Sequence, residues 1–361
     1  MSTVSRPRVV LLHAPVGGGH RAAAEALAMA VRSAGIDTEV LDAFTFAPKS
    51  FTECYRAFHF AGQGLAPKLY GRAYFRANQR SPFDSVRADL DLAILRPLVS
   101  HLRERAPDVV VATHHLALVA VARAKARGEL SCRIACVVTD YTAHAVWAVE
   151  GVDVYFVANS IVADELASHG VPRSRIVCTG IPVKQAFSEI PPLTLPEANG
   201  PLQVLLTSGG FGVGPIVEVL RGFAGLSGME LTVVCGASDT VRTRASTYAK
   251  RYGLKANVLG FVRDMPSLMA GSHVVVGKAG GLTVTETLTA ARPLVIVGAV
   301  PGNEAMNETW VTMGGAGASA APSLAGATIL SLAGRLGDMG ARGREMVARN
   351  AASEIARILA A

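Results

Sequence analysis

A strand–loop–helix opening that occurs twice is the feature that most constrains the fold of this chain. In the first copy, a buried strand is predicted over residues 9–12, followed by the loop "HAPVGGGHR" and a helix over residues 22–33. A second strand over residues 38–41 completes a βαβ unit. The second copy, "QVLLTSGGFGVGPIVEVLRGF", begins at residue 203. Because βαβ units hold their strands parallel, the repeat indicates two parallel α/β sheets.

Further strand patterns alternate with helical stretches in both halves. They are "DVVVATHH", "RIACVVTD", "DVYFVANS" and "RIVCTGIPV", then "LTVVCGA", "NVLGFV", "HVVVGKAGG" and "PLVIVGAVPG". Five prolines between residues 180 and 201 indicate a linker. We therefore expect two Rossmann-like domains that face a cleft: residues 1–182, a linker over 183–200, and residues 201–335. Helices over residues 336–361 could cross back to the first domain.

Composition restricts the class of protein. Half of the 361 residues are apolar, yet no apolar run reaches the roughly 18 residues of a membrane span or resembles a signal peptide. The five cysteines are odd in number and form no C-x-x-C pair, so we expect reduced core thiols in a cytoplasmic protein, without a metal site. The net charge of +7 is shared almost evenly by the two halves, which argues against a nucleic-acid partner.

The first glycine loop ends in His20. Three glycines allow close backbone approaches, and the helix that follows offers free N–H groups. The loop lacks the Gly-Lys-Ser/Thr of a phosphate-binding P-loop and the G-x-G-x-x-G of a dinucleotide site, although Asp42 keeps a nicotinamide cofactor as an alternative. A titratable imidazole suits proton transfer, so His20 is the candidate base, and Asp140 could orient it or be the base itself. The competing interpretation is that His20 only caps the helix.

The second half has the features of a nucleotide-binding domain. Two glycine loops, "SGGFGVG" and "KAGGLTVTE", each lead to a helix and could hold a diphosphate, although either could be a tight turn. We expect the donor to meet Gly209, Gly210, Phe211, Gly212, Phe261, Val262, Lys278, Gly280, Gly281, Leu282, Thr283 and Glu286, with Glu286 on the ribose hydroxyls. Polar side chains for a sugar would come from Asn303, Glu304 and Asn307, unless "PGNEAMN" is simply a capped surface loop.

Residues 44–83 combine basic and aromatic side chains, with ten of the chain's twenty-one aromatics. Arg72, Arg76 and Arg80 share one helical face. Such a mixture suits an anionic lipid surface, whereas the alternative is an amphipathic lid packed on the core. The sequence predicts a peripheral protein on the inner face of the membrane.

Several motifs in order resemble the family of monogalactosyldiacylglycerol synthases and processive diacylglycerol glucosyltransferases: "GGGHRAAAEAL", "ATHH", "VVTDYTAHAVW", "TGIPV", "SGGFG", "KAGGLTVTE" and "PGNEAMN". The resemblance spans residues 8–320. More distantly, the chain is similar to the transferase that adds N-acetylglucosamine to a lipid-linked peptidoglycan precursor, which has the twin-Rossmann GT-B fold. The resemblance implies a UDP-hexose donor in the second domain, a diacylglycerol-like acceptor in the first, inversion at the anomeric carbon, and no metal or other cofactor.

Details of this family pattern bear on specificity and on the acceptor. Asn303 stands where the family has glutamine, which leaves galactose or glucose open. The D-x-D at Asp89 to Asp91 is expected on a solvated helix face, so it predicts no metal site. Acceptor or membrane contacts are expected from Gly18, Gly19, His114, His144, Trp147 and the three arginines. A UDP-sugar 2-epimerase and a non-catalytic UDP-sugar sensor remain alternatives, since both would keep the donor loops.

Overall fold

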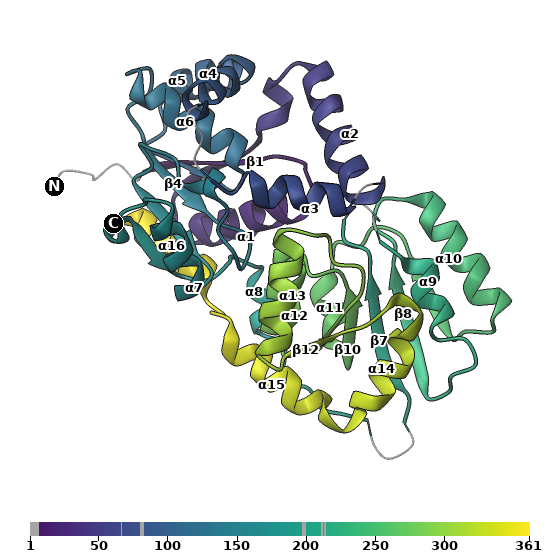
Figure 1. Ribbon diagram of the computed structural model, residues 1–361. Helices are drawn as coiled ribbons and strands as arrows, with labels where there is room; N and C mark the ends of the chain where they lie inside the picture. Colours follow the sequence, from purple (N-terminus) through teal and green to yellow (C-terminus); the bar gives the residue numbers. More distant parts are fainter. Residues whose placement is uncertain (1–6, 66, 80–82, 197–199, 211, 213) are drawn as a thin grey trace. The chain divides into compact units, whose positions relative to one another are not determined.

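The computed structural model describes residues 7–65, 67–79, 83–196, 200–210, 212 and 214–361; of residues 58–65, 67, 68 and 70 it describes the backbone alone. The predicted site residues Arg80 and Phe211 lie outside the described residues. The chain forms two compact units, one of Met1–Lys184 with Asn350–Ala361 and one of Gln185–Arg349 (Figure 1). The first division falls inside the proline-rich segment predicted as a linker, where a short helix, α8 (Gln185–Ser188), begins.

The first unit is built on a six-stranded parallel sheet in the order β2-β1-β3-β4-β5-β6. The central strands are continuous runs of small and branched apolar residues buried on both faces, as parallel sheets require. The strands are β1 (Arg8–His13), β2 (Asp37–Asp42), β3 (Val109–Ala112), β4 (Arg133–Val137), β5 (Val154–Val157) and β6 (Ile176–Cys178).

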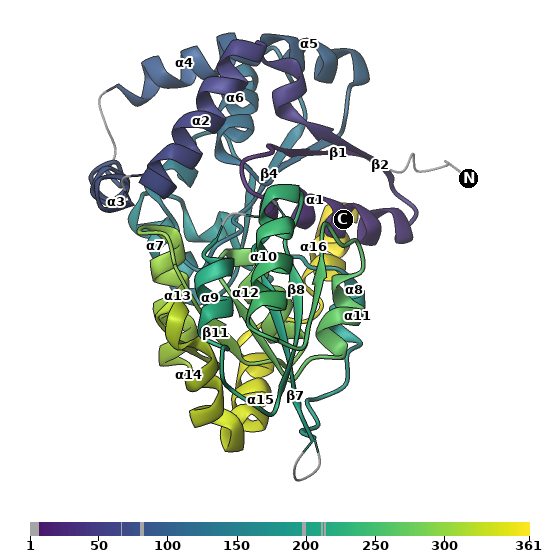
Figure 2. The ribbon, with the colours of Figure 1, turned by 90° about the vertical axis from the view of Figure 1, so that its right-hand side faces the viewer.

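Helices cover both faces of this sheet. On one face α1 (Gly19–Ser33) packs with α16 (Ala351–Ala360) over Val9 and Leu11, so the C-terminal helix belongs to the first unit (Figure 2). The other face is covered by helices that include α5 and α6. The remaining elements of the unit are α2 (Lys49–Leu65), α3 (Pro67–Arg76), α4 (Asp84–Ile94), α5 (Arg96–Arg105), α6 (His115–Ala126), α7 (Ser160–Ser168) and the short turns η1 (Ala43–Phe46), η2 (Ala145–Trp147) and η3 (Arg173–Arg175).

The second unit repeats the design with the strand order β12-β11-β10-β7-β8-β9. Its strands are β7 (Leu202–Thr207), β8 (Met229–Val234), β9 (Ala256–Leu259), β10 (Val274–Gly277), β11 (Leu294–Ile296) and β12 (Gly317–Ser319). Its other helices are α9 (Ile216–Arg221), α10 (Asp239–Arg251), α11 (Met265–Ala270), α12 (Gly281–Thr289), α13 (Asn303–Met313), α14 (Ala325–Leu332), α15 (Leu336–Met346) and the turns η4 (Pro322–Leu324) and η5 (Ala333–Arg335). The predicted class, α/β with two parallel sheets, is confirmed.

Two expectations about surface residues are wrong in part. Asp91 is only 8% exposed, because its side of α4 packs inward, and one of its carboxylate oxygens has no hydrogen-bond partner. Asp89 does lie at the surface, where it pairs with Arg123 at 2.5 Å. Of the five cysteines, Cys54 and Cys178 are exposed rather than in the core, and all five are free thiols.

Candidate active site

The first glycine loop connects β1 to α1 at the carboxyl edge of the first sheet. Gly17 has φ +82°, a conformation that side chains rarely adopt, so glycine is required there. The helix begins at Gly19, earlier than predicted, with Gly18 at the N-cap and no side-chain cap. His20 therefore lies in the first turn of α1, and the interpretation of His20 as a helix cap is wrong.

His20 is held by residues that follow two other strands. Its Nδ1 lies 2.6 Å from the carbonyl oxygen of Thr113, after β3, and 3.1 Å from Oγ1 of Thr139, after β4. The Thr113 hydroxyl is 2.9 Å from the carbonyl oxygen of His20, to which it can donate. A carbonyl can only accept, so Nδ1 carries the proton, and Nε2 of the neutral ring keeps its lone pair. This geometry prepares Nε2 to accept a proton.

The electrostatic surroundings keep His20 neutral near pH 7. Burial lowers the pKa of His20 from its usual 6.5, while the nearby Asp140 carboxylate opposes that shift by favouring the charged ring. Asp140 is half-buried, three residues beyond the end of β4. The arrangement fits a base whose cationic form is stabilised after it takes a proton.

Other histidines near this edge have structural partners. The His114 ring meets the His20 ring edge-on at 4.9 Å, but its Nδ1 accepts from the backbone N–H of Leu116 and caps α6. His144 caps η2 and donates from Nε2 to the carbonyl of Tyr74 at 3.0 Å. Trp147 is buried at the end of η2. Capping and packing contacts thus occupy His114, His144 and Trp147, which the sequence predicted to contact the acceptor.

The contact between His144 and Tyr74 also holds α3 against the first unit, with ring centroids 4.6 Å apart. Arg72 and Arg76 of the same helix are exposed, and Phe75, whose ring meets that of Tyr74 edge-on, is 52% exposed. Tyr74 thus packs on the first unit, whereas the lipid-facing role of the exposed side chains stays a prediction.

The first glycine loop of the second unit follows β7. Gly209 and Gly212 have positive φ angles of 70° and 73°. A methyl group built on Gly212 would lie 2.5 Å from the carbonyl oxygen of Cys235, so packing against the loop after β8 requires glycine there. The backbone N–H of Ala237 donates to the carbonyl of Gly210 across the same contact. These two loops are fixed against each other at the carboxyl edge of the sheet.

The second glycine loop joins β10 to α12. Gly280 is the N-cap of α12, and no side chain caps this end of the helix. The first-turn N–H groups of Gly281, Leu282 and Thr283 therefore have no side-chain acceptor at the N-cap. Leu282 is buried, and Glu286 is half-buried on the next turn. The first-turn N–H groups and the helix dipole favour an anion at this end.

The predicted donor and sugar residues Lys278 and Glu304 are paired with each other. Their charged groups lie 3.0 Å apart and both side chains are largely buried. The second oxygen of Glu304 accepts from the backbone N–H of Val300 at 2.9 Å. This pair joins the loop after β10 to the start of α13, so the ammonium of Lys278 is already partly neutralised.

The remaining residues predicted to contact the sugar or the donor differ in how deeply they are buried. Asn307 is fully buried and donates to the carbonyl of Ala279, so it positions the second glycine loop rather than offering its amide to a sugar. Asn303 is half-buried as the first residue of α13. After β9, Phe261 is 64% exposed and Val262 is half-buried.

Sequence reasoning missed Thr113 and Thr139, the two residues that hold His20. Both directly continue apolar strand runs, "VVVAT" and "ACVVT". Polar residues at adjacent strand ends were the available signal, because the carboxyl ends of parallel strands meet at one edge.

Comparison with known proteins agrees with this architecture. Residues 20–183 match the family model for monogalactosyldiacylglycerol (MGDG) synthase, and residues 216–309 match the glycosyltransferase family 28 C-terminal domain. A protein of Bacillus cereus strain B4264 named processive diacylglycerol beta-glucosyltransferase is 27% identical over 87% of this chain and 82% of its own length. A Bacillus mycoides protein of the same name is 26% identical over the same shares.

Solved structures show the same fold at low sequence identity. Acinetobacter baumannii MurG is 18% identical, with a TM-score of 0.62 over 98% of this chain and 99% of that one. The UDP-GlcNAc 2-epimerase of Neisseria meningitidis, solved with UDP-GlcNAc, is 12% identical, with a TM-score of 0.59 and the same coverage. Among the described residues, no helix is long and apolar enough to cross a membrane. By its two successive domain matches, the chain belongs to the MGDG synthase group of family 28 glycosyltransferases and has the GT-B fold.

Proposed function

We propose that this family 28 glycosyltransferase moves a hexose from a UDP-sugar to diacylglycerol, with inversion at the anomeric carbon. The observation that carries the proposal is the orientation of His20. Its Nδ1 is occupied by the carbonyl of Thr113, so the basic Nε2 is the nitrogen left for a hydroxyl proton. The curated relatives, whose names specify diacylglycerol, support the choice of acceptor.

In the proposed reaction, the acceptor oxygen attacks the anomeric carbon while its proton moves to Nε2 of His20. The bond from that carbon to the diphosphate oxygen breaks on the opposite side of the sugar, which inverts the configuration. The Asp140 carboxylate stabilises the imidazolium that results, since it already raises the pKa of that ring. Asp140 as the base itself is the competing assignment.

The second unit would bind the donor. Its glycine loops would offer backbone N–H groups at Gly210 and Gly214 after β7 and at Gly280 to Thr283, and the dipole of α12 favours the diphosphate charge. The N–H groups of Gly209 and Gly212 already donate to Oγ1 of Thr207 and to the carbonyl of Gly209. Glu286 would accept hydrogen bonds from the ribose hydroxyls. Such a cradle replaces a divalent cation, so we propose transfer without a metal or other cofactor.

The hexose is proposed as glucose, with galactose as the second candidate. The relatives at 26–27% identity are named glucosyltransferases, whereas the family model matched by the first unit is named for galactosyl transfer. Asn303 begins α13 half-buried beside the Lys278–Glu304 pair. It is the residue that we expect to influence the choice.

We also propose that the protein works on the cytoplasmic face of an anionic membrane, through α3. Arg72 and Arg76 are exposed beside Phe75, so cations could meet headgroups while the ring enters the interface. Vesicles with anionic lipid should sediment the protein, and added salt should weaken the effect. Equal sedimentation with neutral vesicles would contradict this surface.

The decisive assay measures UDP release from UDP-glucose and UDP-galactose, with and without detergent-solubilised diacylglycerol. Diacylglycerol should stimulate release, and the glycolipid formed should have the anomeric configuration opposite to that of the donor. UDP release that is indifferent to lipid would contradict the proposed acceptor.

A 2-epimerase is the second candidate, because the fold similarity to the Neisseria enzyme is nearly as high as that to MurG. Such an enzyme would need no lipid. Conversion of a UDP-sugar to its 2-epimer in the absence of diacylglycerol would favour it.

A further inference from the structure

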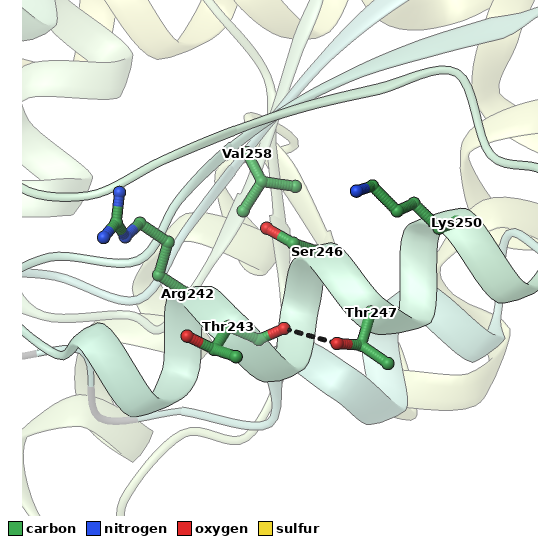
Figure 3. Close-up of a pocket in the computed structure, with 6 residues that line it drawn as sticks. All are labelled: Arg242, Thr243, Ser246, Thr247, Lys250 and Val258. Carbon is green, nitrogen blue, oxygen red and sulfur yellow. Dashed lines mark hydrogen bonds between the residues drawn. The ribbon is translucent and has the colours of Figure 1, made fainter.

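A pocket of about 300 Å³ lies between α10 and β9 in the second unit, and none of its lining residues is among those predicted to contact the donor. Figure 3 shows Arg242 and Lys250 at its two ends, with Ser246 and Val258 between them. Thr243 and Thr247 complete the lining. Because β9 is an edge strand of its sheet, the pocket opens at the sheet's margin rather than at the carboxyl ends of the central strands.

The lining is rich in hydrogen-bond donors and has no acidic residue. Arg242 and Lys250 are eight residues apart on one helix, about 12 Å along its axis, and Ser246 is one turn from each. Both cationic side chains are long enough to bend toward the middle. Three hydroxyl groups lie along the same helix, and Val258 supplies an apolar wall. The Thr247 hydroxyl already donates to the carbonyl of Thr243 at 2.9 Å, which leaves Thr243 and Ser246 as the hydroxyl donors for a ligand. A guanidinium, an ammonium and hydroxyls together match the oxygens of a phosphate group.

The ion pair of Arg242 leaves it available for a ligand. Its Nη2 lies 3.0 Å from the Asp239 carboxylate, three residues earlier on the same helix, and both side chains are well exposed. Such exposed pairs contribute little and are readily exchanged for another anion. The guanidinium also has further N–H groups that this single contact does not use.

We infer that this pocket binds a small phosphate-bearing anion at a site separate from the donor cradle. Its volume is at the lower limit of small-molecule sites, which fits a phosphorylated metabolite or one lipid headgroup rather than a polymer. Because the pocket is open to water, binding should be weak and should decline as salt rises.

Arg242 connects this pocket to the donor side of the unit. A methyl group built on Gly260 would lie 3.6 Å from Cδ of Arg242 and 3.9 Å from the carbonyl oxygen of Gly236. The stem of Arg242 thus covers the residue just before Phe261 and Val262. An anion that draws the Arg242 guanidinium into the pocket would change the packing of the Arg242 stem over Gly260.

Pyrophosphate is the probe for calorimetric titration of the full-length chain, with excess UDP present to occupy the donor cradle. Arg242→Gln and Lys250→Gln should each weaken pyrophosphate binding about tenfold, the usual effect of losing one charged hydrogen bond. Arg244→Gln is the matched control, since it removes the same charge from the same helix but does not line the pocket. It should stay within about twofold of the unaltered protein.

The three variants distinguish a phosphate site in the pocket from a general attraction of anions to a basic helix. All three positions are exposed on α10, and circular dichroism checks that each variant is folded. Equal pyrophosphate affinity in all three variants, or no measurable binding by the unaltered chain, would overturn the inference. Titration with vesicles containing phosphatidate identifies the source: weaker vesicle binding by Lys250→Gln assigns the pocket to lipid headgroups, and unchanged vesicle binding with weaker pyrophosphate binding assigns it to soluble phosphates.

Discussion

The two units contain the same sheet but place different chemistry at its carboxyl edge. In the first unit, strand ends present side chains that can move a proton, with His20 held by Thr113 and Thr139. In the second, glycine-rich loops offer backbone N–H groups, and the ammonium of Lys278 is already partly neutralised by Glu304. One parallel architecture thus provides either a titratable group or an anion cradle, according to the residues that follow each strand.

The largest expected effect tests the titratable edge. His20→Ala should lower turnover by about two to four powers of ten, the usual effect of removing a general base, and should leave UDP affinity nearly unchanged. Steady-state rates and calorimetric titration with UDP measure the two quantities on folded protein.

His114→Asn is the matched control for His20→Ala. It removes a neighbouring imidazole, but asparagine can still cap α6, so the rate should stay close to that of the unaltered protein. A folded His20→Ala variant with full activity would transfer the role of base to Asp140.

Asp140→Asn should lower the rate about ten- to a hundredfold, because the imidazolium formed during transfer loses its carboxylate. The Thr113 carbonyl still fixes the tautomer, which keeps the loss below that of His20→Ala. In the proposed mechanism neutral His20 is the active form, so the rate should rise with pH through its pKa, and Asp140 raises that pKa. The acidic limb of kcat/KM should therefore move to lower pH in the variant. An acidic limb that stays at the same pH or moves to higher pH would contradict the interaction between Asp140 and His20.

Buried charge also distinguishes the units away from the strand ends. Asp91 in the first unit is buried with one oxygen unpaired, and burial raises its pKa to about 6. Arg292 in the second unit is equally buried, but it donates to several backbone carbonyls at the ends of α11 and α12. We therefore expect only the aspartate to impose a pH-dependent cost on stability.

Proton linkage fixes the direction in which Asp91 makes stability depend on pH. The folded state holds the Asp91 proton more tightly than the unfolded chain, so stability falls as pH rises from about 4 to about 6 and the full cost applies above that range. Asp91→Asn should raise the free energy of unfolding by about 2 kcal/mol at pH 7.5 and by much less at about pH 4. Urea denaturation at the two pH values measures the difference. The same gain at both values would refute the titration of Asp91 as its cause.

Glu286→Ala tests the cradle. Loss of the ribose hydrogen bonds should weaken UDP binding about tenfold, with a smaller change in the rate at saturating donor. Glu218→Ala, a surface change on α9, serves as the control with the same change in charge. Unchanged UDP affinity in Glu286→Ala would remove this residue from the donor site.

Strand positions could be predicted from sequence wherever long apolar runs were present, which covers eleven of the twelve strands. β12 was missed because it consists of Gly317, Ala318 and Ser319, whose small side chains carry no strand pattern. The start of α1 was predicted three residues late, since glycine and histidine are weak helix formers that here lie in the first turn.

The site could be predicted only in its outline. His20 was identified because the glycine loop marks its position, but Thr113 and Thr139 lie 93 and 119 residues away and meet it only through strand order. Asn307 looked available to a sugar because polarity alone cannot show that α13 buries it against Ala279. The burial of Asp91 likewise depends on how α4 packs, which a short D-x-D pattern does not reveal.

The smallest expected effect concerns divalent cations. In the second unit, the proposed partners of the diphosphate are N–H groups at Gly210 and Gly214 and at the start of α12, which bind oxygen anions directly and cannot ligate a metal. Of the two carboxylates placed in the proposed donor site, Glu304 is committed to Lys278 and to the Val300 N–H, which makes it a poor ligand, and Glu286 is assigned to the ribose. Transfer should therefore continue unchanged in excess EDTA. Loss of activity in EDTA that magnesium or manganese restores would show that the cradle needs a cation, and the contrast between the two units would then lie in metal binding rather than in backbone donors.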